Sequence, residues 1–339
     1  MRKKISKIFT ISVCTILSIF LILSLVTSCG AVELAATRVP QEQINFPAKL
    51  GVTIITLAHP CGIAVADGIE KEAKVQDFEY TIHDADWSTE IQISQIEALI
   101  RKNPDVIIVY PIDSGAIAST CKRAEEKGII VITIQSDSAY PTSCYLAWDF
   151  YRGARAAAKK LAEQLDGKGK VALIGSMPGD PNGELRVQGY REILADYPGI
   201  EIVATQYGDW QRKKTKDVTE SLLARYPDID AIACVDDGMA MGAIAAVKAA
   251  GLPLGTGPDE IRVWGLDGWK EAKDAIQEGE LAGTVCANYF TTGVMAVDFA
   301  RALLNGGIRG GQVQLAWKTP FTLVTKSNLD QVPEEAWME

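Results

Sequence analysis

The chain reads Asp230-Ala231-Ile232-Ala233-Cys234-Val235-Asp236-Asp237-Gly238-Met239-Ala240-Met241-Gly242-Ala243 across its most informative stretch. An apolar run with the length of a buried parallel strand ends on two adjacent carboxylates, and a run rich in small residues follows as far as Gly251. This pattern predicts a strand, a polar tip and a helix, which together form one unit of a doubly wound α/β sheet. We expect Asp237 to cap the helix, because aspartate is preferred there, and Asp236 to point into the crevice where ligands bind.

The same alternation of apolar and amphipathic runs extends along the chain from Leu50. The predicted strands cover residues 51–57, 79–82, 106–110, 129–134, 145–147, 171–174, 200–205, 231–235, 263–266 and 283–286. The predicted helices include residues 89–101, 115–127, 151–165, 214–225 and 270–277. Regular alternation of strands and helices is typical of a parallel sheet covered by helices on both faces.

A break in this alternation divides the chain into two parts. It follows the strand-like run at residues 145–147, and a fresh strand begins after Asp166-Gly167-Lys168-Gly169. A length of 339 residues and an apolar content of 47% are sufficient for two hydrophobic cores. We therefore predict two doubly wound α/β lobes rather than one very large sheet.

The charge of the chain bears on its partners. The formal net charge is −9 at pH 7, although four of the basic residues, Arg2, Lys3, Lys4 and Lys7, lie in the first segment. The rest of the chain has no basic stripe of the kind that binds nucleic acid. We therefore expect no nucleic-acid partner.

The first residues have the pattern of an export signal. A basic start precedes an uncharged apolar run at residues 8–26, which is long enough to span a bilayer as a helix. The run ends in Val26-Thr27-Ser28-Cys29, and small residues ending on cysteine resemble a bacterial lipoprotein processing site. We therefore predict a signal peptide over residues 1–28, lipidation of Cys29 and a tether over residues 29–48, where polarity is mixed.

The cysteines do not form a metal-binding pattern. Once Cys14 leaves with the signal and Cys29 takes lipid, five remain: Cys61, Cys121, Cys144, Cys234 and Cys286. Their spacing matches no zinc motif, and we expect neither a metal nor a cofactor. We expect Cys234 and Cys286 to be buried in strands. Cys121 and Cys144 flank one helix-strand unit and could form a disulfide, a question that the sequence leaves open.

Polar and aromatic residues follow the predicted strands. The first lobe offers His59, Tyr110 and Gln135, and the second offers Asn182, Glu184, Arg186, Trp210, Asp236 and Asp267. A doubly wound fold would bring these strand ends to one side, facing a shared cleft. Carboxylates and amides suit a ligand rich in hydroxyl groups, and aromatic rings can cover its apolar C–H faces.

Enzyme motifs are missing from the sequence. No Gly-x-Gly-x-x-Gly follows the first strand, and Gly175-Ser176-Met177-Pro178-Gly179 lacks the lysine of a phosphate loop. There is no Gly-x-Ser-x-Gly elbow, and the two histidines, His59 and His83, have no helical i,i+4 spacing. We therefore predict that the protein is not an enzyme.

Four motifs carry a resemblance to a known family. The segment 178–186 is similar to that family's segment of polar sugar ligands, and 236–243 resembles its Asn-Asp-x-Met-Ala-x-Gly-Ala signature. Gly265-Leu266-Asp267-Gly268 matches Gly-Phe-Asp-Gly, and 281–285 matches a late strand near the hinge. From about residue 48 to residue 326, the chain resembles the periplasmic sugar-binding proteins of the type I fold, the ribose and galactose/glucose receptor family.

The resemblance implies three crossovers between the lobes. The N-terminal lobe would comprise residues 49–147 plus 288–319, and the C-terminal lobe residues 148–287 plus 320–339. Carried over by position, the ligand site would be lined by His59, Gln135, Asn182, Arg186, Trp210, Asp236 and Asp267. The calcium loop of some galactose receptors has no counterpart here.

This sequence departs from the family pattern at several site positions. Cys61 and Gly62 stand where aromatic residues are usual, so one stacking face is missing unless Trp148 or Tyr110 supplies it. Ser136 occupies a second position at which the family has arginine. The other arginine position falls on Arg186 or on Glu184, depending on the register, and the sequence leaves this choice open.

The resemblance implies a lipid-anchored, extracytoplasmic receptor of an ABC importer. It would capture a small polyhydroxy ligand, a sugar or polyol, by hinge closure, and would deliver it to a permease. We expect a monomer that meets the membrane only through its lipid anchor. The alternative is a signalling receptor for a small non-sugar or cationic ligand. The effector domain of a transcription regulator shares this fold, but no helix-turn-helix precedes it here.

Overall fold

The computed structural model describes residues 47–178 and 180–338, which belong to one compact unit, Gln43–Glu339. The predicted signal peptide, the predicted lipidation site Cys29 and nearly all of the predicted tether lie outside these residues. No helix in the described part of the chain has both the length and the apolar content that a membrane span requires.

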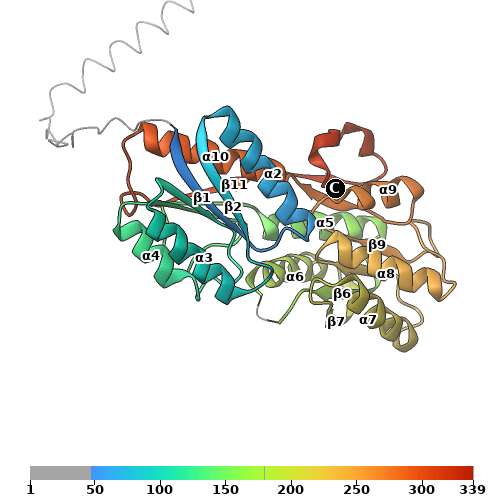
Figure 1. The fold of residues 1–339 in the computed structure, drawn as a ribbon. Coiled ribbons are helices and arrows are strands. Elements are labelled where there is room, and N and C mark those ends of the chain that lie inside the picture. The colour runs from blue at the N-terminus through green and yellow to red at the C-terminus, as the bar shows by residue number, and fades with distance from the viewer. Residues whose placement is uncertain (1–46, 179, 339) are drawn as a thin grey trace, which may run out of the picture. The chain divides into compact units, whose positions relative to one another are not determined.

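A parallel sheet forms the centre of the first lobe (Figure 1). Its strands are β1 (Ala48–Ile54), β2 (Phe78–Asp84), β3 (Val106–Val109), β4 (Ile130–Ile134), β5 (Cys144–Trp148) and β11 (Leu315–Thr319). They are arranged in the order β11-β5-β4-β3-β1-β2, and every neighbouring pair is parallel. All of these strands therefore end at the same edge of the sheet.

Helices cover both faces of this sheet: α2 (Pro60–Val75), α3 (Thr89–Lys102), α4 (Ala118–Glu126) and α10 (Tyr289–Asn305). Successive residues of a strand point to opposite faces. Accordingly, Ile108 and Ile132 belong to the core cluster that contains residues of α2 and α10, whereas Ile107 and Val131 pack with residues of α3 and α4. Figure 1 shows the two pairs of helices on opposite sides of the strands.

The second lobe has the same construction. Its strands are β6 (Lys168–Gly175), β7 (Gly199–Tyr207), β8 (Ala231–Cys234), β9 (Arg262–Trp264), β10 (Thr284–Ala287) and β12 (Phe321–Val324). The first four form a parallel sheet in the order β7-β6-β8-β9, and β10 pairs antiparallel with β12. A bridge between Trp264 and Gly283 links the two sets of strands.

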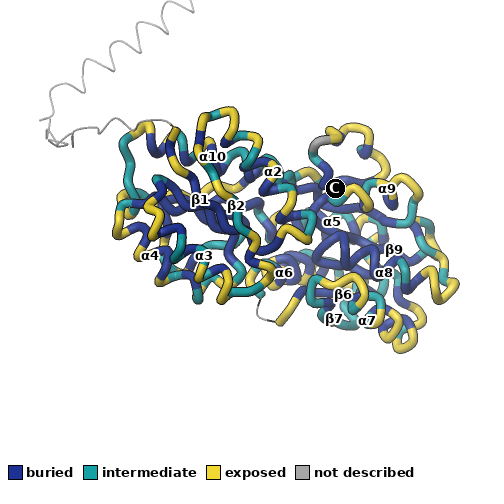
Figure 2. The backbone as a smooth tube through the Cα atoms, in the orientation of Figure 1, coloured by how far each residue is buried: buried dark blue, intermediate teal, exposed yellow. Residues whose placement is uncertain are grey.

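Five helices surround these strands: α5 (Phe150–Gln164), α6 (Pro181–Ala195), α7 (Arg212–Arg225), α8 (Asp237–Ala249) and α9 (Lys270–Glu278). Helix α5 packs against α6, and α7 packs against α8. Two short 3-10 turns follow β12: η1 (Leu329–Gln331) and η2 (Glu334–Ala336). Figure 2 shows dark blue, buried strands inside both lobes and yellow, exposed residues on the outer helices.

The chain passes between the lobes three times. The crossovers lie between β5 and α5, between β10 and α10, and between β11 and β12. This arrangement confirms the predicted α/β fold of two doubly wound lobes joined by a three-stranded hinge.

Several predicted boundaries are shifted. The strand predicted at residues 51–57 lies at Ala48–Ile54. The helix predicted from residue 115 begins only at Ala118, because the Asp113 carboxylate accepts hydrogen bonds from Gly115 N and Ala116 N and holds a turn there. Strand β11 was not predicted, because its residues Leu315 and Trp317 are exposed and give no buried apolar run.

Candidate functional site

An ion pair between Arg186 and Asp267 lies at the centre of the site. Arg186 is on the first turns of α6, and Asp267 follows β9. Two guanidinium nitrogens each lie 3.0 Å from a different oxygen of the Asp267 carboxylate, and both side chains are only 3% exposed. A bidentate pair of this kind fixes the orientation of both groups.

Tyr289, the first residue of α10, completes this centre. Its hydroxyl donates to Asp267 Oδ1 at 2.9 Å and accepts hydrogen bonds from Trp148 Nε1 at 3.0 Å and from Arg186 at 3.3 Å. Tyr289 and Trp148 belong to two different crossovers, so residues of the hinge hold the ion pair in place.

Three aromatic rings surround the Arg186 guanidinium. Its central carbon lies 5.0 Å from the ring centre of Trp148, 4.7 Å from that of Phe150 and 5.3 Å from that of Trp210. These are distances at which a cation is attracted to the face of a ring. The Trp210 indole N–H donates to Asp180 Oδ2 at 2.9 Å, which fixes this ring beside the start of α6.

The structure corrects the expected roles of the two adjacent aspartates. Asp236, and not Asp237, caps α8: its Oδ1 accepts a hydrogen bond from Met239 N at 2.5 Å. The other oxygen, Asp236 Oδ2, is buried and has no hydrogen-bond partner among the described residues. Burial, together with the nearby Asp267 carboxylate, raises the pKa of Asp236 to about 7.

Asp237 instead fixes the loop that carries Asp267. Its Oδ2 accepts hydrogen bonds from Gly268 N at 2.7 Å and from Trp269 N at 2.8 Å, and its Oδ1 accepts one from Thr284 at 2.7 Å. Asp267 has a φ of 108°, a backbone conformation that is rare for a residue with a side chain and needs such support.

A segment after η2 holds the same loop from its other side. Met338 N donates to Gly268 O at 2.9 Å, and Lys270 N donates to Met338 O at 2.7 Å. The thiol of Cys286 donates to Ala336 O at 3.1 Å. The loop at residues 267–269 is therefore clamped between α8 and this segment.

The first lobe contributes residues at the ends of its own strands. Gln135 is completely buried with a φ of 60°, and its Nε2 donates to Thr292 at 3.3 Å. Its Oε1 has no hydrogen-bond partner within the described part of the chain. Across the lobes, Asn182 Nδ2 donates to Ser136 Oγ at 2.9 Å. Ser136 therefore meets a residue of the other lobe directly.

His59 and Tyr110 also lie near this centre. His59 caps α2, and burial lowers the pKa of its imidazole. Tyr110 is buried, and burial, followed by the nearby Cys61 thiol, raises the pKa of its hydroxyl. The electrostatic influence of Asp267 and Arg186 reaches both residues.

Glu184 is not brought to this centre. Its side chain is exposed on α6, whereas Arg186, two residues further along, is buried. Of the two residues between which the sequence left the register open, the structure therefore places only Arg186 beside Asp267. The helix repeat explains the difference, because residues two apart lie on different sides of a helix.

Four residues of the site were absent from the predicted set: Trp269, Tyr289, Phe150 and Asp237 in its observed role. Tyr289 and Trp269 each follow a strand by a few residues. The rule that selected the other strand ends could therefore have found them. The sequence indicates for Trp148 only the role of a stacking face, whereas in the structure its indole N–H donates to the hydroxyl of Tyr289.

The five cysteines in the described residues are all buried and unpaired. The disulfide between Cys121 and Cys144 that the sequence left open is not formed. Cys234 and Cys286 lie in β8 and β10, which confirms their predicted burial in strands.

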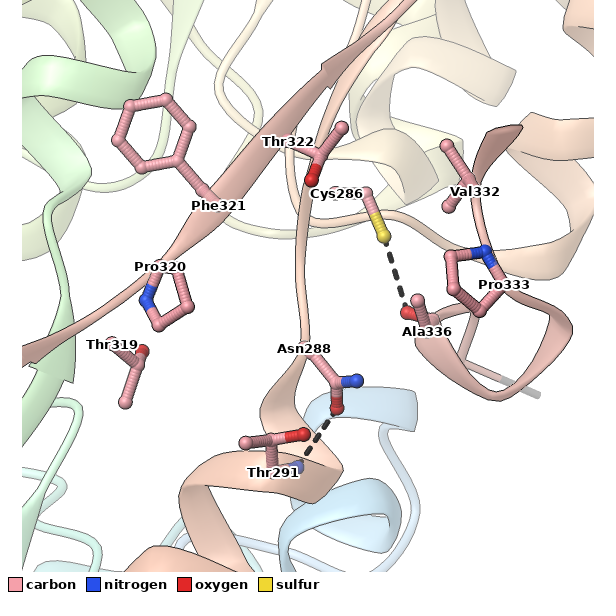
Figure 3. Close-up of a pocket in the computed structure, with 10 residues that line it drawn as sticks. All are labelled: Cys286, Asn288, Thr291, Thr319, Pro320, Phe321, Thr322, Val332, Pro333 and Ala336. Atoms are coloured by element: carbon pink, nitrogen blue, oxygen red, sulfur yellow. Dashed lines mark hydrogen bonds between the residues drawn. The ribbon is translucent and has the colours of Figure 1, made fainter. Parts of the chain in front are cut away.

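A separate pocket of about 180 Å³ lies at the hinge (Figure 3). Its walls come from the crossover before α10, the crossover between β11 and β12, and the segment around η2. They include Asn288, Pro320, Phe321 and Pro333. None of the predicted ligand residues lines this pocket, so it is distinct from the strand-end site.

Two α/β lobes, three crossovers and a polar site at facing strand ends define a solute receptor of the type I periplasmic binding fold. The model of the periplasmic binding protein domain family matches residues 50–308. The chain belongs to this family.

The comparisons with known proteins agree on this family. The ribose import binding protein of Bacillus subtilis is 31% identical over 327 residues, covering 96% of this chain and all of that protein. A periplasmic solute-binding protein from Actinobacillus succinogenes with bound D-allose has a TM-score of 0.77 and 28% identity, covering 84% of this chain and all of that one. A solute-binding protein from Bacillus halodurans with bound myo-inositol has a TM-score of 0.76 and 25% identity, covering 86% of this chain and 98% of that one.

Proposed function

We propose that this protein captures a sugar or polyol between its two lobes and delivers it to an ABC permease. Four buried polar atoms carry the proposal: Gln135 Oε1, Asp236 Oδ2, Arg186 Nε and Trp269 Nε1 have no hydrogen-bond partner among the described residues. Leaving such an atom unpaired costs about 1–3 kcal/mol, so a ligand that pairs with it is bound favourably.

The four atoms also indicate the chemistry of the ligand. Two of them accept hydrogen bonds and two donate, and they belong to both lobes. A hydroxyl group can donate and accept, so a polyhydroxy compound can satisfy all four. Ligands bound to similar proteins support this class, since two of the similar structures hold D-allose and myo-inositol.

A screen of small sugars, polyols and amines by thermal shift tests the proposal. A compound that binds only the folded state raises the melting temperature in proportion to the logarithm of its concentration. We expect sugars or cyclic polyols to raise it and simple amines to leave it unchanged. A shift with amines alone would contradict the proposal.

A cationic ligand is the second candidate, because the charge of Asp236 is not balanced. Arg186 is already paired with Asp267, and the free Asp236 oxygen has no partner in the described part of the chain. The neutral ligand remains the stronger candidate. The raised pKa of Asp236, about 7, means that its carboxyl group is partly protonated at neutral pH and can then donate to a hydroxyl.

The anchor at Cys29 is part of the proposal. The motif Val26-Thr27-Ser28-Cys29 supports lipidation, which would hold the receptor at the outer face of the cell membrane or in the periplasm as a monomer. The lobes would be divided at residues 147/148, 287/288 and 319/320, of which the first falls before the last residue of β5 and the other two fall at the ends of β10 and β11.

We predict that Cys29→Ser releases or mislocalises the protein, because serine cannot take the thioether-linked lipid. Cell fractionation measures this, with Cys61→Ser as a control that leaves the motif intact. Equal retention of Cys29→Ser and wild type in the membrane would contradict lipid anchoring.

A further inference from the structure

Trp269 extends from the second lobe to the first. It follows Asp267 and Gly268 at the start of α9, and its ring meets the imidazole of His59, with ring centres 5.1 Å apart and planes at 82°. His59 meets Trp87 in the same edge-on manner, with ring centres 6.1 Å apart. The three rings form a row from the second lobe into the first at the strand-end side.

The Trp269 ring also packs against the first turn of α8, next to Asp236. A Cβ atom at Gly238 would lie 2.5 Å from the ring carbon Cη2 of Trp269, so only glycine allows this approach. The backbone N–H of Trp269 is held by Asp237, and Met338 pairs with the residues on either side. The position of the ring is therefore fixed from three directions.

The polar atom of this ring is its indole nitrogen, Nε1. Trp269 Nε1 is buried and makes no hydrogen bond to any described residue, although buried indole N–H groups usually find a partner. Asp236 Oδ2, at the start of the helix on which the ring packs, is a buried acceptor without a partner in the same set of residues. A donor and an acceptor are thus both unpaired beside the inter-lobe contact.

The resemblance implies an aromatic face where this chain has Cys61 and Gly62, and Tyr110, one of the two expected substitutes, is buried. Trp148 does not supply it, because its ring is fully buried against Arg186 and Phe150 and its N–H is bound by Tyr289. Trp269 is half-buried, lies between the lobes and has an N–H with no hydrogen-bond partner in the described ranges 47–178 and 180–338.

We propose that Trp269 is a specificity-determining residue of the ligand site: its indole N–H donates to a ligand oxygen, and its ring covers a C–H face of the ligand. This inference rests on the proposed function. The Trp269 ring would favour cyclic over open-chain polyhydroxy compounds, because a ring-shaped sugar or cyclic polyol offers a flat C–H face that an open-chain polyol does not.

Calorimetric titration of three variants with D-allose and with myo-inositol tests the inference. Trp269→Phe keeps a ring against His59 and Gly238 but removes the N–H, so we expect the Kd to rise roughly 5- to 20-fold. Trp269→Leu also removes the ring, and we expect a rise of at least ~25-fold. Trp87→Phe is the matched control: Trp87 is in the same row of rings but is 47% exposed, and its Kd should stay within about twofold.

A purely structural role makes a different prediction. If Trp269 only packs, phenylalanine fills the space and Trp269→Phe binds like wild type, which would overturn the inference. A second measurement uses the wild-type protein: the indole N–H resonance of Trp269, assigned by its loss in Trp269→Phe, should shift on saturation with the probe. An unmoved resonance would likewise overturn the inference.

Failure of the proposed function is a distinct result. If the wild-type protein binds neither D-allose nor myo-inositol nor any sugar or polyol of the screen, the proposed function and this inference fall together. If wild type binds and Trp269→Phe binds equally well, only the role of Trp269 falls.

Discussion

Substitution of Asp236 distinguishes a neutral ligand from a cationic one. For a neutral polyol, Asp236→Asn should change the binding free energy by less than about 1 kcal/mol, because an amide oxygen still accepts a hydrogen bond. For a cationic ligand the same change removes a charge partner and costs on the order of 2–5 kcal/mol. Titration calorimetry at two salt concentrations measures the difference. A large loss of affinity that depends on the salt concentration would indicate that the ligand is a cation and not a neutral polyol.

The same substitution has a predictable effect on stability. Burial raises the pKa of Asp236 from 3.8 to about 7, so in that pH range the folded protein holds a proton that the unfolded chain has lost. The free energy of unfolding of wild type therefore falls as pH rises through this range, by an amount on the order of a few kcal/mol. Asparagine caps helices as well as aspartate does and has no proton to lose.

We expect Asp236→Asn to match wild type in stability near pH 4 and to exceed it near pH 8. Urea denaturation at both pH values, without ligand, measures this. If the free energies of unfolding of Asp236→Asn and wild type differed by the same amount at both pH values, the Asp236 carboxylate would not be destabilised by burial.

Tyr289 tests whether the hinge positions the ion pair. Tyr289→Phe removes the hydroxyl that bonds Asp267, Arg186 and Trp148 but keeps the ring. We expect the Kd for the ligand to rise roughly 5- to 20-fold and the free energy of unfolding to fall by about 1–3 kcal/mol, because the Trp148 N–H loses its acceptor.

Tyr190→Phe is the matched control for Tyr289→Phe. Tyr190 is buried on the same helix as Arg186, but its hydroxyl has no hydrogen-bond partner among the described residues. Its removal should leave the Kd unchanged. Equal effects of the two substitutions on the Kd would show that the Tyr289 hydroxyl has no positioning role.

Among the secondary-structure elements, α4 is tied to its neighbours by one buried carboxylate. Glu125 accepts hydrogen bonds from Val131 N at 3.0 Å, from Ser143 N at 2.8 Å and from Gly311 N. It thereby joins α4 to β4, to the start of β5 and to the loop before β11. Glu125→Gln replaces one acceptor oxygen by a donor, so at least one of these backbone N–H groups loses its acceptor.

We expect Glu125→Gln to lower the free energy of unfolding by about 1–3 kcal/mol while ligand affinity stays unchanged. The control is the next residue, Glu126, which is exposed in an i,i+4 pair with Lys122, so Glu126→Gln should cost less than about 0.5 kcal/mol. Chemical denaturation measures both. Equal stability of the two variants would contradict the role of Glu125.

Most elements could be predicted because their signals are local. Helix α3, predicted at residues 89–101, lies at Thr89–Lys102, where Ser88 caps its start. The polar tips of β4 and β8 were likewise predicted, because parallel strands end at one edge. Strand β11 could not be predicted, because it is stabilised by pairing with β5, which is distant in sequence.

The roles of individual site residues depended on contacts that sequence does not reveal. Which of Asp236 and Asp237 caps α8 is decided by the loop at residues 267–269, whose N–H groups engage Asp237. Tyr289 acquires its role only because the second crossover brings it against Trp148, more than a hundred residues earlier in the chain.

At the scale of the whole molecule, ligand binding should close the lobes. Candidate ligand contacts lie on both lobes, Gln135 on the first and Asp236 with Asp267 on the second. The contacts between Asn182 and Ser136 and between His59 and Trp269 already join the lobes. A ligand that bridges them favours the state in which it makes the most contacts.

Small-angle scattering measures this closure. We expect a smaller radius of gyration with saturating ligand than without it. The variant Asp236→Asn, which keeps the helix cap, serves as a binding-competent control if the ligand is neutral. Identical radii with and without ligand would indicate a site confined to one lobe.

The buried thiols have a practical consequence for labelling chemistry. Burial raises the pKa of all five described cysteines, to about 12 for Cys121, Cys144 and Cys286 and also well above the ordinary value for Cys61 and Cys234. The thiolate is the form that reacts with a maleimide dye, so these side chains are inert near neutral pH. In a form that starts after Cys29, one cysteine placed at the exposed position 184, on the helix that carries Arg186, would carry the only dye, and a change in its emission on ligand binding would make the receptor an optical sensor.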